Sequence, residues 1–280
     1  QQVDLVAGTA AFEDARTLRL THEGATETVS AERFIIATGA RPSAGPWAFD
    51  GHRVLSYRDL LTHPTLPRSL LIIGGGVMGC EFASCFAGFG VPVTIIEQQA
   101  QLLPLEDAEA ARVLTQGLQA RGVTIRANTT VRAFTTSHEG VQATLADGST
   151  LTAQQGLLSI GLSPNSQELG LERLGIQTSR GIEVNEALLT RQPHIAAIGD
   201  CLPGHGLAHL ASAEGLLAVH NLYDPPPTLL ERRLVPRCAY TDPEVAHVGR
   251  GEAEAPPSAR VSRFAFAALG KSLCDEEPEG

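Results

Sequence analysis

Long hydrophobic runs are missing from this 280-residue sequence, and without about 18 consecutive apolar residues we expect no membrane span. Positive charge is also scarce: 21 lysine and arginine residues face 31 acidic ones, for a formal net charge of -10. A nucleic-acid partner is therefore not suggested. The first residues, QQVDLVAGTAAF, contain neither an initiator methionine nor a basic n-region. We therefore expect a fragment without a signal peptide.

Cysteine is scarce as well, with five residues at positions 80, 85, 201, 238 and 274. An odd, scattered set does not resemble the disulfide framework of a secreted protein. No pair has the CxxC spacing of a zinc site, so we expect no metal. These absences favour a reducing, cytoplasmic location.

An alternation of apolar strands and helices begins near residue 69. Strands are expected at 69–73, 91–96 and 123–127, and helices at 77–89 and 108–120. This alternation predicts an α/β fold in which a parallel sheet is built with right-handed crossovers.

From residue 129 the apolar period becomes two, which predicts a three-stranded antiparallel meander. Its strands are expected at 130–136, 141–145 and 149–158. Residues 3–40 resemble short strands joined by turns. We also expect strands at 181–184, 194–198, 234–241 and 261–266, a helix at 207–222 that stops before Pro225, and frayed residues at 275–280.

The sequence LLIIGGGVMGCE at 70–81 places GxGxxG directly after a strand and at the start of a helix. Gly74 would permit the tight turn, Gly76 the approach of a pyrophosphate, and Gly79 close packing of helix on strand. The phosphates would lie on free N–H groups at the helix N-terminus. A glycine-rich turn can also exist without a ligand, but this one lies inside a complete βαβ pattern.

Glu97 ends the second strand, VTIIE, about where a ribose-binding acid belongs. Its carboxylate could accept hydrogen bonds from the ribose 2′- and 3′-hydroxyls and would repel a 2′-phosphate. Gln98 and Gln99 follow, without an arginine or lysine that could bind that phosphate. The pattern therefore favours NAD(H) over NADP(H).

Several motifs occur together in one order. They are IIATGARP at 35–42, LIIGGGVMGCEFA at 71–83, SIGLSPN at 159–165, HIAAIGD at 194–200, GLAHLASAEG at 206–215 and VPRCAYTDPEVAHVG at 235–249. With them the chain resembles the flavoprotein pyridine nucleotide–disulfide oxidoreductases, and among these most closely the dihydrolipoyl dehydrogenases. The resemblance covers nearly all of the chain.

The resemblance implies two dinucleotide sites, one for NAD and one for FAD. The implied NAD-site residues are Gly74, Gly75, Gly76, Val77, Met78, Gly79, Cys80, Glu81, Glu97, Val131 and Gly161. The implied FAD-site residues are Gly8, Thr38, Gly39, Ala40, Asp200, Gly206, Leu207, Ala208 and His209. Without its motif, Asp200 would be more typical of a turn or helix cap, and His209 of packing; no proton transfer is assigned to His209.

The resemblance also implies a domain order. A partial FAD-binding domain covers residues 1–66, and a Rossmann-like NAD-binding domain covers 67–187 as an insertion. The FAD-binding domain returns at 188–230. The start of a truncated α+β interface domain follows at 231–280, and the complete enzyme would be a homodimer.

Two features of such enzymes are absent. The family's redox disulfide and its catalytic His–Glu pair both lie outside the chain, so no catalytic residue is assigned, and His220 and His247 are given no catalysis. Cys80 and Cys85 share the Cys-x4-Cys spacing, but on one helix their Cα atoms would be about 8.6 Å apart, which is too far for a disulfide. Glu81, whose family partner is a lysine missing here, could equally be a solvated first-turn acid.

The complete protein is thus expected to be a FAD-dependent oxidoreductase that passes electrons between a dithiol, free or on a lipoyl domain, and NAD. The fragment alone should lack dithiol activity. Soluble transhydrogenase, mercuric reductase and glutathione reductase-like enzymes of the same superfamily are alternatives. A non-catalytic module that senses NADH is an alternative of another class.

Overall fold

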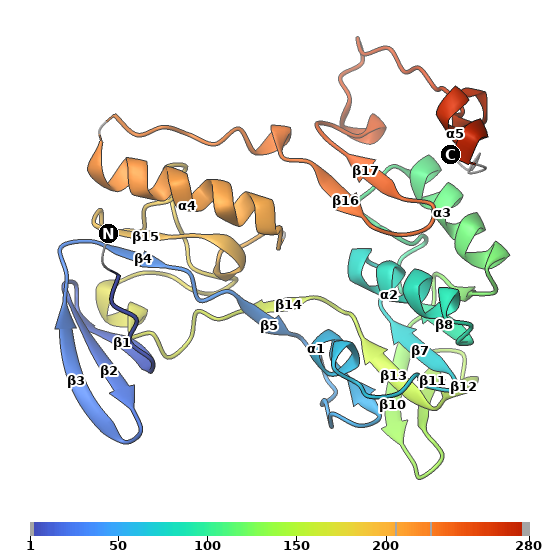
Figure 1. Ribbon diagram of the computed structural model, residues 1–280, viewed down its shortest axis with the longest axis horizontal. Helices are drawn as coiled ribbons and strands as arrows, with labels where there is room; N and C mark the ends of the chain where they lie inside the picture. The colour runs from blue at the N-terminus through green and yellow to red at the C-terminus, as the bar shows by residue number, and fades with distance from the viewer. Residues whose placement is uncertain (1–2, 205, 225, 276–280) are drawn as a thin grey trace. The chain divides into compact units, whose positions relative to one another are not determined.

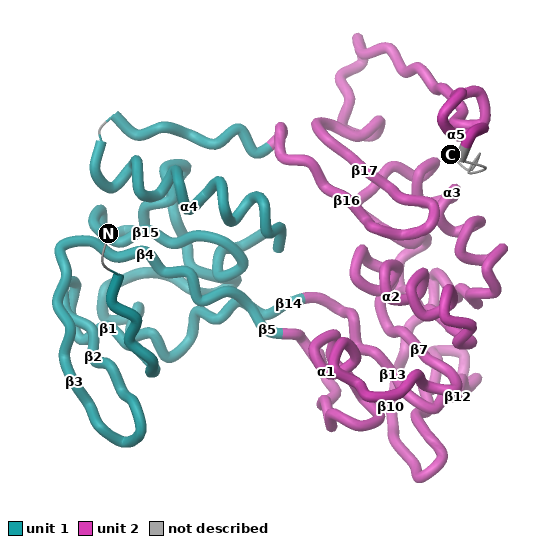
Figure 2. The backbone as a smooth tube through the Cα atoms, in the orientation of Figure 1, with its two compact units in different colours: residues 1–41, 162–232 teal, residues 42–161, 233–280 magenta. Residues whose placement is uncertain are grey.

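The computed structural model describes residues 3–204, 206–224 and 226–275. The chain divides into two compact units, one formed by residues 1–41 and 162–232 and the other by residues 42–161 and 233–280 (Figure 2). We call them unit 1 and unit 2. Pro225 and the expected frayed end at 276–280 lie outside the described residues.

Unit 2 is built on a five-stranded parallel sheet with the order β6-β13-β7-β8-β9 (Figure 1). The strands are β6 (Val54–Leu55), β13 (Gln155–Leu158), β7 (Leu70–Ile73), β8 (Val93–Ile96) and β9 (Thr124–Arg126). Every residue of the central strand β7 is buried. A strand covered on both faces needs a continuous apolar sequence, which explains why LLII does not alternate.

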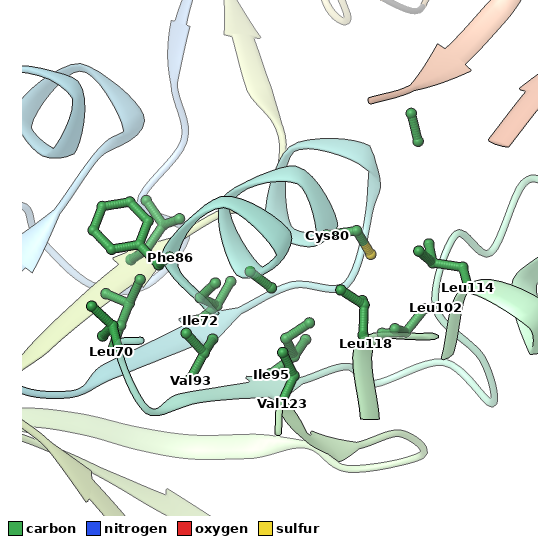
Figure 3. Close-up of a cluster of buried hydrophobic side chains, with 14 of the residues drawn as sticks. Leu70, Ile72, Cys80, Phe86, Val93, Ile95, Leu102, Leu114, Leu118 and Val123 are labelled. Atoms are coloured by element: carbon green, nitrogen blue, oxygen red, sulfur yellow. The ribbon is translucent and has the colours of Figure 1, made fainter. Parts of the chain in front are cut away.

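Two crossover helices, α2 (Val77–Gly88) and α3 (Ala108–Ala120), connect the central strands. Leu114 and Leu118 of α3 and Cys80 and Phe86 of α2 belong to one buried cluster with the strand side chains (Figure 3). The strands contribute Leu70, Ile72, Val93 and Ile95 to this cluster. The predicted alternation of strand and helix, and the parallel sheet, are confirmed.

The antiparallel meander consists of β10 (Val131–Thr136), β11 (Val141–Leu145) and β12 (Thr150–Ala153). It packs with Leu71, Ile73 and Ile96 of the parallel sheet in a second buried cluster. The single strand predicted at 149–158 is wrong, because the chain leaves the meander at Gln154 and β13 joins the parallel sheet beside β7. The two strands also differ in burial: TLTA is half-exposed, whereas QGLL is fully buried.

Unit 1 contains a meander of β1 (Thr9–Asp14), β2 (Thr17–His22) and β3 (Ala25–Ser30). The next strand in the chain, β4 (Phe34–Ile36), pairs in parallel with β15 (Ile195–Ala197). Helix α4 (Ala208–Tyr223) follows the 3-10 turn η2 (Gly199–Cys201). The short strands β5 (Ala40–Pro42) and β14 (Leu162–Pro164) form a two-stranded sheet.

Two predicted strands are absent from the described residues. At 181–184 the chain makes one isolated bridge, Ser179 with Gly181, and then irregular bonds such as the one that Ile182 N donates to Cys201 O. At 261–266 no strand forms, and the exposed segment runs into η5 (Phe266–Ala268) and α5 (Gly270–Asp275). An alternating sequence becomes a strand only where a partner strand is available.

The segment that begins near residue 233 starts with a hairpin of β16 (Arg237–Ala239) and β17 (Val245–His247). The shorter elements are α1 (Tyr57–Leu61), η1 (Leu171–Leu174), η3 (Arg232–Leu234) and η4 (Glu252–Glu254). Among the described helices, none combines the length and apolarity that crossing a membrane requires. In the same residues, no group of three or more His, Cys, Asp or Glu side chains is arranged to hold a metal ion.

Thiol reactivity should divide the cysteines by burial. Cys85 and Cys274 are exposed, whereas burial raises the pKa of the Cys80 thiol to about 12 and also raises the pKa of Cys201. Because the thiolate is the reactive form, iodoacetamide at pH 8 should modify Cys85 and Cys274 and spare Cys80 and Cys201. Labelling of Cys80 should increase only as the pH approaches 12. Peptide mass spectrometry, with a urea-unfolded control, tests this; native Cys80 labelled as fast as Cys85 would contradict it.

Candidate functional site

The GxGxxG turn connects the end of β7 to the start of α2. Gly74 has a φ of +108°, and its N–H donates to Ile96 O at 2.9 Å. A Cβ at Gly74 would overlap the backbone carbonyl of Ser159, at the end of β13. The turn is therefore held between the carboxyl ends of two neighbouring strands and requires glycine for both conformation and space.

The other two glycines of the motif differ in what surrounds them. A Cβ at Gly79 would overlap the Gly74 carbonyl oxygen, so this glycine permits the close approach of α2 to the turn. A Cβ at Gly76 would meet nothing within 4 Å. Gly76 is the N-cap of α2 and offers no side chain to bond the first helical N–H groups. The open space at Gly76 thus lies where these donors could receive an anionic ligand.

A cavity of about 770 Å³ opens at this turn. Seven of the predicted NAD-site residues line it: Gly74, Gly76, Val77, Met78, Glu97, Val131 and Gly161. The predicted residues Gly75, Gly79, Cys80 and Glu81 are not in its lining. The cavity lies at the carboxyl ends of the parallel strands, where open α/β sheets bind ligands, and its volume suits a small-molecule site.

Glu97 is 6% exposed and follows β8 directly. Its Oε2 accepts a hydrogen bond from Gly75 N at 2.6 Å, and its Oε1 accepts one from Gln99 N at 2.7 Å. The carboxylate is therefore fixed beside the glycine turn. Because each carboxylate oxygen can accept about two bonds, both oxygens keep acceptor capacity toward the cavity.

Glu81 is the fifth residue of α2 and therefore is not a first-turn acid. Its Oε1 accepts a hydrogen bond from Tyr240 N at 2.9 Å. The bond links α2 to the end of β16, and the two residues are 159 positions apart. No sequence pattern within 70–81 indicates this contact.

Several lining residues were not identified from the sequence. Trp47, the only tryptophan, lines the cavity, and its ring packs edge-on against Phe134 with 6.1 Å between the ring centroids. Pro104 and Leu105 form another part of the wall. They lie in irregular segments, where neither periodicity nor a motif marks them.

The predicted FAD-site residues lie in unit 1, most of them after the paired strands β4 and β15. Thr38 Oγ1 donates to Asn165 O at 2.6 Å, and Asn165 N donates to Gly39 O. Asp200 lies in η2, and a Cβ on Gly206 would be 3.1 Å from Asp200 Oδ2. The structure therefore brings Asp200 and Gly206 together.

The other residues predicted for the FAD site do not take part in the contact between Asp200 and Gly206. Leu207 is the N-cap of α4, and Ala208 and His209 open the helix. Ala40 begins β5. Gly8 precedes β1, where a Cβ would be 2.8 Å from Thr21 O of β2.

A buried acid that the sequence reasoning missed lies near Asp200. Glu214 of α4 is 2% exposed, accepts from Gly199 N at 2.8 Å, and pairs with Arg232 at 2.9 Å. The bond fixes the turn that carries Asp200. The spacing LASAEG contains Glu214, but only the fold shows that the side chain points inward.

Comparison with known proteins places this arrangement in a family. The model of the pyridine nucleotide-disulphide oxidoreductase family matches residues 1–215. The chain belongs to this family. Membership implies binding of FAD and of a nicotinamide dinucleotide.

Two curated relatives show the range of the family. A dihydrolipoyl dehydrogenase from Bacillus subtilis is 36% identical over 285 residues, which is 100% of this chain and 62% of the relative. An NAD(P)H dehydrogenase (quinone) from Mycobacterium tuberculosis is 36% identical over 249 residues, which is 88% of this chain and 50% of the relative. The chain thus spans only part of the relatives that it matches.

Solved structures agree on the α/β fold. LpdA from Mycobacterium tuberculosis superposes with a TM-score of 0.90 at 32% identity, covering 98% of this chain and 63% of that one. The HOCl-induced flavoprotein disulfide reductase RclA from Escherichia coli superposes with a TM-score of 0.89 at 28% identity, covering 99% of this chain and 65% of that one. The predicted fold class is confirmed.

Alanine substitution should separate the three glycines of the turn by stability. Gly76→Ala should leave the unfolding midpoint nearly unchanged, because the new Cβ meets open space. Gly74→Ala and Gly79→Ala should each destabilise unit 2 by about 1–3 kcal/mol, because the Cβ overlaps backbone that cannot move freely. Thermal unfolding by circular dichroism checks this, and equal losses in all three variants would contradict the assignment.

Proposed function

We propose that the cavity in unit 2 binds NAD(H) and prefers it to NADP(H). The turn at Gly74–Gly79 would hold the pyrophosphate, with Gly76 facing it. The ribose nearest the adenine would lie on Glu97. Val131 would contact the adenine end, and Gly161 would lie along the opposite wall.

The position of the Glu97 carboxylate is the observation that carries the proposal. It is fixed by two backbone N–H groups and lies in the cavity lining beside the turn. A carboxylate there can accept from ribose hydroxyls and repels a phosphate at the 2′ position. Among the described residues that line the cavity, none is an arginine or lysine that would offset this repulsion.

We further propose that the protein is a FAD-dependent oxidoreductase that passes electrons between a dithiol and NAD. The residues around Thr38 and Asp200, and those at Gly206–His209, would hold FAD. The flavin would supply the two-electron transfer between dithiol and nicotinamide. The dihydrolipoyl dehydrogenase relative supports dihydrolipoamide, free or on a lipoyl domain, as the dithiol. A homodimer in the cytoplasm completes the proposal.

Reduction of a quinone by NADH is the second candidate. The relative described as NAD(P)H dehydrogenase (quinone) is also 36% identical, over 88% of this chain against 100% for the dihydrolipoyl dehydrogenase. All five cysteines of the chain are free, and Cys80 is buried. A reaction that needs no redox cysteine pair is compatible with these residues.

Removing the charge of Glu97 tests the choice of nucleotide. Glu97→Gln should weaken NADH binding roughly 10-fold, because a charge-assisted hydrogen bond is replaced by a neutral one. The variant should also lose most of its preference over NADPH. Isothermal titration calorimetry measures both affinities, and circular dichroism confirms folding. Glu139→Gln, an exposed acid on the meander hairpin, is the matched control. NADPH binding to the unchanged protein as tightly as NADH would overturn the proposal.

Introducing a methyl group at Gly76 tests the phosphate contact separately. Gly76→Ala should weaken NADH binding at least about 10-fold, because the Cβ enters the space proposed for the pyrophosphate. ADP should lose affinity in parallel, whereas adenosine should not. Calorimetry with the three ligands checks this; a uniform loss for all three would contradict placement of the phosphates at Gly76.

Turnover by residues 1–280 supplied with FAD tests the second candidate. We expect no formation of NADH from dihydrolipoamide, because the cysteines of this chain form no disulfide. Absorbance of NADH at saturating NAD is the measurement. Measurable dithiol-dependent NADH formation would contradict this expectation. Oxidation of NADH by a quinone in the same sample would favour the second candidate.

A further inference from the structure

A cluster of three ionisable side chains joins the cavity wall to a distant part of the sequence. Glu106 follows the lining residues Pro104 and Leu105. Its Oε2 lies 2.7 Å from His247 Nδ1, and its Oε1 lies 3.5 Å from Arg237 Nε. The Glu106 and His247 side chains are only 9% and 13% exposed. A carboxylate so shielded from water needs hydrogen-bond partners of this kind.

His247 is the stronger of the two partners. Its Nδ1 faces the Glu106 carboxylate, and its Nε2 lies 3.1 Å from Gly249 O. Arg237 Nη2 also lies 3.3 Å from Nδ1, so contacts at both ring nitrogens fix the orientation of the ring. Arg237 lies farther from the carboxylate and is more exposed than His247.

The β16–β17 hairpin that carries His247 is attached to both crossover helices. Tyr240 N donates to Glu81 of α2, and Asp242 N donates to Ser84 Oγ of the same helix at 3.0 Å. Asp242 also pairs with Arg121, the residue that caps the end of α3. The hairpin is thus anchored on α2 and α3 (Figure 1).

On its other side, Glu106 belongs to a turn that contacts the glycine motif. Glu106 N donates to Leu103 O at 2.9 Å, and Leu103 N donates to Gly75 O at 2.8 Å. Gly75 N in turn donates to the Glu97 carboxylate. Successive hydrogen bonds, each sharing a residue with the next, therefore connect His247 to Glu106, the 103–106 turn, Gly75 and Glu97.

We infer that Glu106 and His247 are positioning residues for the nucleotide site, and that the β16–β17 hairpin sets NADH affinity by holding the 103–106 turn. The inference rests on the proposed NAD(H) site. Neither residue touches the ligand; they act through Leu105 in the wall and through Gly75. Coupling between two sites acts equally in both directions, so NADH in the cavity should also protect the hairpin from opening.

Substitutions at His247 test the inference with a built-in rescue. His247→Ala removes the imidazole that contacts Glu106 and should weaken NADH binding roughly 3- to 10-fold. In His247→Asn the amide nitrogen lies about where Nδ1 lies, so affinity should return to within about 2-fold of the unchanged protein. If His247 acted only by its bulk, His247→Asn would not restore the NADH affinity that His247→Ala loses.

A second variant and a control locate the effect. Glu106→Gln should resemble His247→Ala, and the double variant should lose little more than either single one, because both act through one contact. Arg263→Ala is the control. It breaks the half-exposed ion pair with Glu109 in the first turn of α3, close in sequence to Glu106 but outside the cavity wall. This control should leave NADH affinity unchanged.

Hydrogen exchange in the absence of nucleotide gives an independent readout. His247→Ala should speed exchange of the amides of Leu103 and Glu106, and Arg263→Ala should not. If the unchanged protein failed to bind NADH, the proposed function would be wrong. The hydrogen-exchange rates of Leu103 and Glu106 would still test whether the hairpin holds the 103–106 turn. If the unchanged protein bound NADH but His247→Ala and Glu106→Gln changed neither affinity nor exchange, the inference would be overturned and the proposed function retained.

Discussion

The hydrogen bond from Gly75 N to the Glu97 carboxylate is the contact on which the nucleotide site depends. It joins the turn after β7 to the end of β8 inside a buried environment, where an unpaired carboxylate would be costly. The turn supplies a donor that keeps the acid in place, and the acid keeps the turn in its conformation. The proposed ribose site and the proposed phosphate site are thereby joined by a direct hydrogen bond.

Much of this site was visible in the sequence because its signals are local. The strand LLII, the glycines at 74, 76 and 79, and the helix at 108–120 each follow from residues close together in the chain. Each glycine also has the surroundings that its predicted task requires. The strand prediction at 149–158 failed because this segment contains two short strands that belong to two different sheets. The strands at 181–184 and 261–266 failed because alternation cannot reveal whether a partner strand exists.

The contacts that the sequence could not reveal are those between distant residues. Glu106 and His247 are 141 positions apart, and Glu81 and Tyr240 are 159 apart. Periodicity and motif spacing carry no information about such pairs. His247 shows the consequence: its motif gave it no role, and the fold gives it a buried partner beside the nucleotide cavity. No pattern in the sequence indicated that Trp47 lines the cavity.

Trp47 also provides the most direct test of the central claim, because it is the only tryptophan and lines the cavity. Bound NADH absorbs where indole emits, so its binding near Trp47 should quench the emission by energy transfer. Titration with NADH should give a saturable decrease in Trp47 fluorescence, and NADPH should do so only at much higher concentration. A linear, unsaturable decrease with NADH, or the same curve with both nucleotides, would contradict the assignment of this cavity to NAD(H).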